Sequence, residues 1–108
     1  MKKDEETKLF RFRKDINTPE QIAHKALNKV LDRGLVLYGD PVENWKAIAA
    51  RWDVHPIEAP IMRAEEKIVR AKNTYQTDML TFEDSIIDAI GQLLIAAMVH
   101  KDVYGQDE

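Results

Sequence analysis

The 108-residue sequence contains no cysteine and no long hydrophobic run. Without cysteine the chain forms neither disulfides nor thiolate metal sites, and it fits a reducing compartment. Its most apolar stretch, residues 86–99, is too short to span a bilayer and contains Asp88 and Gln92. The N-terminal residues lack the apolar segment of a signal peptide. We therefore expect a cytoplasmic protein with no membrane-spanning segment.

An excess of positive charge is also missing, because 16 Lys+Arg stand against 19 Asp+Glu for a formal net charge of −3. This balance disfavours nonspecific binding to nucleic-acid phosphates. The sequence has no Gly-rich phosphate loop, no nucleophile motif with a recognisable base, and no histidines at metal-ligand spacing. Catalytic residues therefore stay unknown. A composition of 44% hydrophobic and 32% charged residues is typical of one small globular domain.

Helix-start signals divide the chain. Thr18 is the expected N-cap of a first helix, with Pro19 at its first position and Gln21 completing a capping box. Apolar residues at helical spacing continue this helix over about residues 19–33, and Gly34 is its expected stop.

The same pattern recurs at the second helix, where Asp40 is the expected cap, Pro41 occupies the first turn and Glu43 lies three residues after the cap. An apolar stripe at helical spacing follows, formed by Trp45, Ile48, Ala49 and Trp52. We expect this helix to end near Trp52.

A third helix is predicted from Pro60 to about Lys72. Thr81 is the expected cap of a fourth helix that reaches residue 99 or beyond. No strand signal is strong. The prediction is therefore an all-α, four-helix bundle-like domain over residues 18–104, after a flexible or partner-docking arm at 1–17 and before a disordered tail at 105–108. Because the last helix is apolar on nearly all sides, we also expect a homo-oligomer.

Asp84 and Asp88 are four residues apart, so their carboxylates share one face of the fourth helix, and Gln92 continues that face. Paired carboxylates suit Mg²⁺, which takes one or two of them together with water and substrate phosphate. The alternative is a solvated acidic edge, which the spacing alone favours.

Arg63, Lys67 and Arg70 form a basic stripe on the third helix, where Glu66 has the spacing to pair with Arg70. Such a stripe either holds phosphate oxygens or is an exposed face with internal ion pairs. A short loop makes the third and fourth helices antiparallel neighbours, which would set Lys67 and Arg70 near Asp84 and Asp88. The groups then serve as phosphate and metal ligands or form a mutual salt-bridge cluster, and spacing does not choose between them.

Residues 45–62 are similar to a helix-turn-helix, but two details disfavour DNA reading. Asp53 replaces the usual turn glycine, and Pro60 falls inside the would-be recognition helix.

Three stretches, "LYGDPVENWKAIAARW", "EAPIMRAEEKIVRAK" and "DSIIDAIGQLLIAA", resemble a small all-α domain family of unknown function that is common in phage and prophage genomes. The resemblance covers roughly residues 20–97 and implies a phage-type protein in the host-cell cytoplasm. The chain departs from the family pattern at Gly91-Gln92 and at Glu65-Glu66. The positions that match are Tyr38, Gly39, Asn44, Trp52, Lys67, Arg70, Asp84, Ser85 and Asp88.

The order of elements is also distantly similar to the MazG-like nucleoside triphosphate pyrophosphohydrolases, which form dimers or tetramers and bind Mg²⁺ through Glu-Glu-x-x-Glu and a later Glu-x-x-Asp. Val69 stands where the third Glu of the first motif belongs, and Asp84 and Asp88 are spaced by four rather than three. The resemblance implies that, in a catalytic form, Asp84 and Asp88 hold Mg²⁺ with Glu66 assisting.

The leading hypothesis is a protein that binds a nucleotide or nucleotide-derived phosphate, with a divergent pyrophosphohydrolase as its enzymatic form. Lys67 and Arg70 would neutralise phosphate charge, and Tyr38 would stack on a base. Asn44, like Tyr38, is not explained by local structure and is a second candidate for lining the site. The alternative is a non-enzymatic interaction or anti-defence protein that captures a host protein or a signalling nucleotide.

Overall fold

The computed structural model describes residues 16–34 and 40–105, and all regular secondary structure within these ranges is helical. The elements are α2 (Pro19–Asn28), a π-helical segment η1 (Lys29–Gly34) that continues it, α4 (Pro41–Trp52), α5 (Glu58–Thr74) and α6 (Met79–Tyr104). The all-α prediction is confirmed for this part of the chain. Residues 1–15 of the predicted arm, Tyr38, and residues 106–108 of the predicted tail lie outside the described residues.

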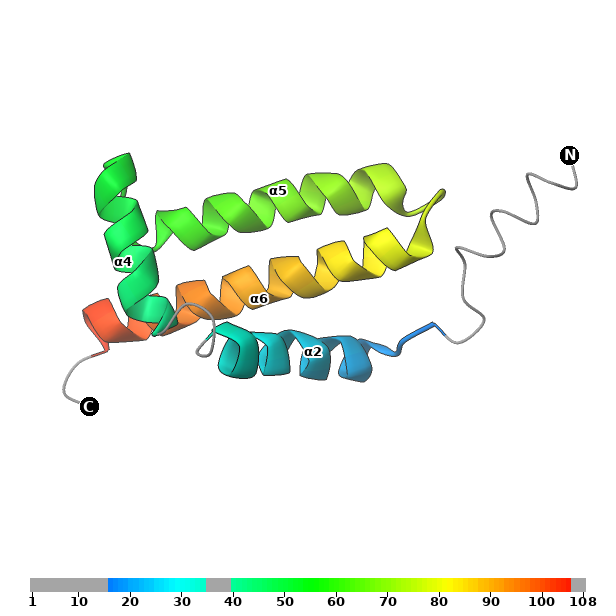
Figure 1. Cartoon of the computed structure of the whole chain (residues 1–108), viewed down its shortest axis with the longest axis horizontal. Helices are drawn as coiled ribbons and strands as arrows, with labels where there is room; N and C mark the ends of the chain where they lie inside the picture. Colours follow the sequence, from blue (N-terminus) through cyan, green and yellow to red (C-terminus); the bar gives the residue numbers. More distant parts are fainter. Residues whose placement is uncertain (1–15, 35–39, 106–108) are drawn as a thin grey trace, which may run out of the picture.

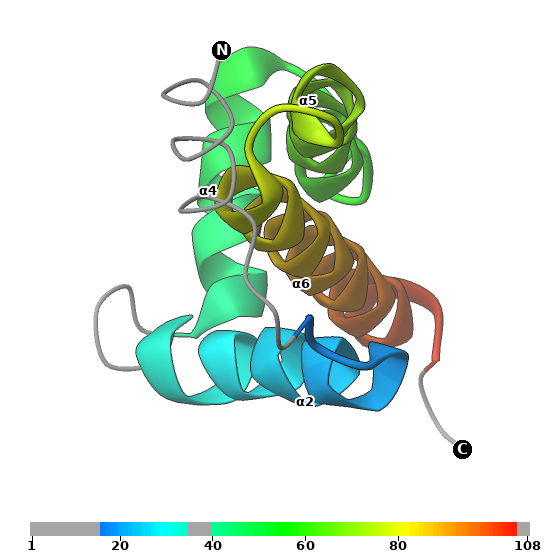
Figure 2. The same cartoon turned by 90° about the vertical axis from the view of Figure 1, so that its right-hand side faces the viewer.

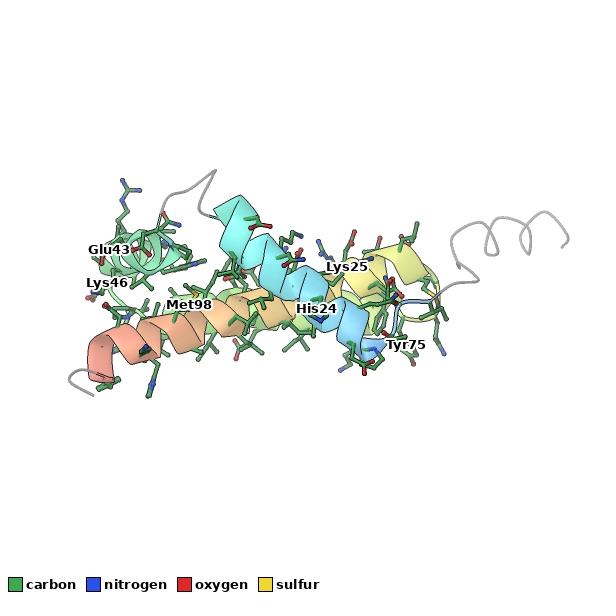
Figure 3. All side chains as sticks on the ribbon, turned by 90° about the horizontal axis from the view of Figure 1, so that it is seen from below. His24, Lys25, Glu43, Lys46, Tyr75 and Met98 are labelled. Carbon is green, nitrogen blue, oxygen red and sulfur yellow. The ribbon has the colours of Figure 1, made fainter. Side chains whose placement is uncertain are left out.

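The antiparallel pair α5 and α6 is the framework of the fold (Figure 1). α6 lies between α5 and α2 when the molecule is seen from its end (Figure 2). α2 crosses α6 diagonally, and α4 lies across the end where α5 begins and α6 finishes (Figures 1 and 3). Among the helices of the described residues, only α5 and α6 therefore run alongside each other as bundle helices do.

The first two helices begin as their sequences predict. The Thr18 hydroxyl accepts a hydrogen bond from the backbone N–H of Gln21 at 3.1 Å, and the Gln21 side chain accepts one from the Thr18 N–H at 2.8 Å. The Asp40 carboxylate accepts the Val42 N–H at 2.9 Å and caps α4. These bonds satisfy N–H groups that the first helical turn leaves without partners.

The predicted cap of the last helix is wrong. Asp78, not Thr81, is the N-cap of α6, and its carboxylate accepts the Thr81 N–H at 3.1 Å and the Thr81 hydroxyl at 2.6 Å. A carboxylate with two donors is the stronger cap, so the helix begins two residues before Thr81.

The corner between α4 and α5 accommodates both details that disfavoured a helix-turn-helix. Asp53 ends α4 at φ 58° and ψ 45°, the left-handed conformation that a turn glycine usually adopts. α5 begins at Glu58, so Pro60 falls in its first turn, where a missing N–H breaks no helical bond. DNA binding stays disfavoured by the net charge of −3 and by Glu65 and Glu66, which are exposed on α5.

The main apolar cluster lies where α4 crosses the hairpin. Trp45, Ala49, Ala59 and Val99 are buried there, and the alanines let helix backbones approach closely. Trp52, predicted as part of the same stripe, remains 48% exposed. Trp52 lines a pocket together with Trp45.

Candidate functional site

Asp88 of α6 is the centre of an ion cluster that joins three elements. Its carboxylate lies 2.5 Å from Lys29 Nζ of η1, 3.2 Å from Arg70 Nη2 of α5 and 3.5 Å from Lys67 Nζ of α5. The structure thus brings together three residues singled out in the sequence, namely Lys67, Arg70 and Asp88. Lys29 was missed because it lies 59 residues from Asp88 and shares no helix spacing with it.

A hydrogen bond to the buried Ser85 hydroxyl orients the Arg70 guanidinium. Arg70 Nε donates to Ser85 Oγ at 2.7 Å, and that hydroxyl donates to the Thr81 carbonyl at 2.7 Å. Ser85 is fully buried, so this chain of bonds is shielded from water. Arg70 is therefore positioned by α6 as well as by its own helix.

The cluster carries a surplus of positive charge. Burial raises the pKa of the Asp88 carboxyl, but the hydrogen bond from Lys29 and the charges of Lys29, Lys67 and Arg70 outweigh it and hold that pKa below its ordinary value of 3.8. At neutral pH three cations thus surround one carboxylate, which leaves a surplus of two positive charges. The side chains of Lys29 and Arg70 are 39% and 40% exposed, so this charge is within reach of an anion from solution.

The predicted metal ligands have separate surroundings. Glu66 pairs with Arg63 at 2.6 Å on the exposed side of α5, and Asp84 is exposed one turn before Asp88. Within residues 16–34 and 40–105 no group of three or more His, Cys, Asp or Glu side chains is arranged to hold a metal ion. The cations around Asp88 would also compete with Mg²⁺ for its oxygens. The contacts around Asp88 match the salt-bridge alternative, and Mg²⁺ binding stays a prediction.

One helical turn farther along the same α5–α6 seam, Arg63 and Gln92 line a pocket of about 390 Å³. The α4 residues on its wall include Asn44, the second of the positions that local structure left unexplained. The remaining lining residues are Trp45, Ile48, Trp52 and Ile95. The pocket therefore combines an aromatic and aliphatic wall with two amides and a guanidinium.

Gln92 contributes an unusual polar atom to this region. Its Oε1 is buried and has no hydrogen-bond partner among the described residues. Leaving a buried acceptor without a donor costs about 1–3 kcal/mol, so a donor that reached this oxygen would be favoured.

A second buried carboxylate, Glu83, was not singled out in the sequence. It is 4% exposed and accepts the Asn17 N–H at 3.2 Å and the Asn17 side-chain amide at 2.8 Å. Lys25 Nζ donates to Asn17 Oδ1 at 3.2 Å, from the face of α2 drawn in Figure 3. These contacts attach the start of α2 to α6. An Asn-Thr-Pro sequence signals a helix start, but nothing in it identifies a partner 66 residues away.

A second hollow lies between α4 and the end of α6, where Val42 and Met98 form part of its wall. Lys46 bridges the two helices there through Asp102 at 2.5 Å, on the side seen in Figure 3. The side chains of Lys46 and Asp102 are both partly exposed to solvent. None of the residues predicted for a site lies in this hollow. Across the described residues, no helix has the length and apolar character needed to cross a membrane.

Comparison with known proteins returns no match of any kind. No family model fits the chain. No curated protein shows significant similarity to it, and no solved structure does.

Proposed function

We propose that this protein binds a nucleotide or nucleotide-derived phosphate through Lys29, Lys67 and Arg70. The observation that carries the proposal is the convergence of these three cations on the single carboxylate of Asp88. Charges of one sign gathered from separate elements repel one another, and a polyphosphate would neutralise the surplus that Asp88 leaves.

Asp88 occupies the place of an anion in the unliganded protein. Asp88 keeps the two lysine ammonium groups and the Arg70 guanidinium together. The Ser85 hydroxyl fixes the direction of Arg70 by accepting a hydrogen bond from the Arg70 Nε. An incoming phosphate would accept hydrogen bonds from Lys29, Lys67 and the outer edge of Arg70. Because the cations are already assembled, little ordering is required on binding.

The contacts around Asp88 favour phosphate binding without hydrolysis. The resemblance to pyrophosphohydrolases extends the proposal to a Mg²⁺-dependent enzyme in which Asp84, Asp88 and Glu66 would hold the ion. In that form Asp88 would have to exchange its three cationic partners for the metal. The surplus positive charge supports the simpler role of a phosphate-binding protein, and the phage-type origin proposed for it rests on the sequence resemblance alone.

Calorimetric titration of the full chain with pyrophosphate and nucleoside mono-, di- and triphosphates, with and without Mg²⁺, tests the proposal. Lys67→Gln and Arg70→Gln should each weaken binding about tenfold, the effect of losing one charge-assisted contact. Lys72→Gln is the matched control, because it removes an exposed cation from the same helix outside the cluster. Equal losses in all three variants, or no binding by any of these ligands, would refute the proposal.

A second candidate function is protein–protein interaction. Ile61, Met62, Ile68 and Val69 are large apolar residues that remain between 37% and 56% exposed on α5. Such a surface fits a homo-oligomer, as a dimer or tetramer, or the capture of a host protein. Light scattering that gives a strict monomer, together with a failure of Ile68→Lys to disturb any partner binding, would count against this candidate.

A further inference from the structure

The pocket at the α4 end of the seam contains an aromatic surface with one free side. Trp45 is 8% exposed and contacts Trp52 edge to face, with ring centroids 6.5 Å apart and an interplanar angle of 72°. Trp52 is thereby supported from one direction while 48% of its surface stays open. An open indole of this kind is a stacking platform for a planar ring.

The polar groups of the pocket suit the edge of such a ring. Asn44 and Gln92 both line it, and the buried Oε1 of Gln92 lacks a hydrogen-bond donor. Asn and Gln amides pair with the amino group and N7 of adenine, because one amide offers an acceptor and a donor side by side. At about 390 Å³ the pocket lies within the range of roughly 300–1,000 Å³ that small-molecule sites occupy.

The pocket and the ion cluster lie at neighbouring positions along the interface between α5 and α6. Gln92 lies four residues after Asp88 on α6, and Arg63 lies four residues before Lys67 on the antiparallel α5. Four residues of helix, about 6 Å, therefore separate the two sets of groups along the helix axes. A ligand that joins a planar ring to a phosphate through a short linker can contact both.

We propose that this pocket receives the adenine base of a nucleotide, which stacks on Trp52 and donates its amino group to Gln92. The proposal rests on the phosphate-binding function, since it places the phosphate of the same ligand at Lys29, Lys67 and Arg70. Turning the Gln92 amide toward the pocket gives its oxygen the donor that it lacks in the free protein.

Three probes separate the base from the phosphate in calorimetric titrations of the full chain. These are adenosine 5′-monophosphate, purine riboside 5′-monophosphate, which lacks the amino group, and ribose 5-phosphate, which lacks the base. Affinity should fall about tenfold when the amino group is removed and about tenfold again when the base is removed. Guanosine 5′-monophosphate should bind more weakly than the adenine nucleotide, because its keto group offers no donor to Gln92 Oε1.

Two variants locate the effect. Trp52→Leu should lower adenosine monophosphate affinity about tenfold and leave ribose 5-phosphate affinity unchanged. Gln92→Leu should abolish the preference for adenosine monophosphate over purine riboside monophosphate. Tyr75→Leu is the control, since Tyr75 is 54% exposed at the opposite end of the hairpin (Figure 3). Circular dichroism establishes that each variant is folded before it is titrated.

The outcomes distinguish this inference from the function beneath it. Equal affinity for the three probes, or tighter binding of the guanine nucleotide, overturns the base site and leaves phosphate binding intact. Adenosine, titrated as a fourth probe that lacks the phosphate, tests the base site by itself. Trp52-dependent binding of adenosine with no binding of ribose 5-phosphate or pyrophosphate supports the base site and overturns the phosphate function. Binding of none of these compounds overturns both.

Discussion

α4 and α2 are attached to the same hairpin by different physical means. α4 buries Trp45 and Ala49 against Ala59 and Val99, a contact made of apolar side chains. The chain around α2 and η1 buries Ala26 and Val30 but also makes polar and charged contacts with α6, through Asn17 to Glu83 and Lys29 to Asp88.

The difference follows the composition of α6. Its first half buries Glu83 and Ser85 beside the apolar Ile87 and Ala89, and it places Asp88 in the ion cluster. The buried residues of its second half, Ala96 and Val99, are all apolar. The two halves meet beside Gln92, where the pocket lies. Salt and pH should therefore affect the α2 side of the molecule, while loss of apolar volume should affect the α4 side.

Trp45→Ala should have the largest effect on stability. Removing a buried tryptophan side chain costs about 3–5 kcal/mol, because the cavity left behind closes only in part. Urea unfolding followed by far-UV circular dichroism measures the loss, which should be independent of salt. Trp52→Ala is the matched control and should cost about 1 kcal/mol, because that ring is 48% exposed. Equal losses would show that both rings belong to the core.

Asp88→Asn should have the second-largest effect. Without the carboxylate, Lys29, Lys67 and Arg70 repel one another, and we expect a loss of about 1–2 kcal/mol after allowing for solvent screening of these partly exposed groups. Added salt should reduce the difference from the wild type, since it screens that repulsion. Asp84→Asn, which removes an exposed carboxylate from the same helix, should change stability by less than about 0.5 kcal/mol.

The same variant separates the two forms of the proposed function. As a phosphate-binding protein, Asp88→Asn should bind pyrophosphate more tightly than the wild type, because the three cations have lost their competing anion. As a Mg²⁺-dependent hydrolase it should lose both binding and turnover. Calorimetry and phosphate release measured on one preparation decide between these results.

Local interactions explain which parts of the fold were predictable. Thr18 and Asp40 cap their helices through bonds to residues two or three positions away, so a short stretch of sequence contains all the information. Asp78 and Thr81 are both good capping residues, and only their mutual hydrogen bonds decide which of them begins α6.

The site was predictable only where the topology is simple. A short connection makes α5 and α6 antiparallel, which is sufficient to predict Lys67 and Arg70 near Asp88. The diagonal path of α2 places Lys29 on the same carboxylate, and no spacing within α2 indicates where it crosses α6. Trp45 and Trp52 are likewise equivalent in the sequence, and the direction of α4 across the hairpin decides that Trp45 is buried while Trp52 stays 48% exposed.

The pH dependence of stability tests the charged surroundings of Asp88, and its effect should be smaller than that of the substitutions above. Its pKa in the folded protein lies below the ordinary 3.8 because the neighbouring cations outweigh burial, so its contribution is fully present above 3.8 and is lost as the pH falls through the lower folded value. The stability difference between wild type and Asp88→Asn should therefore be constant from about pH 7 to pH 5 and shrink below 3.8. Shrinkage that begins above pH 5 would mean that burial dominates.

Lys46→Gln should have the smallest effect and completes the comparison on the α4 side. The hydrogen bond to Asp102 raises the pKa of Lys46 above 10.5, so the pair is intact at neutral pH and is lost only as the pH rises through that higher value. Both side chains are exposed to solvent, which screens their attraction, and the urea midpoint should not change measurably at neutral pH. A loss as large as that of Asp88→Asn would show that α4 also depends on charge, and the contrast with α2 would then be wrong.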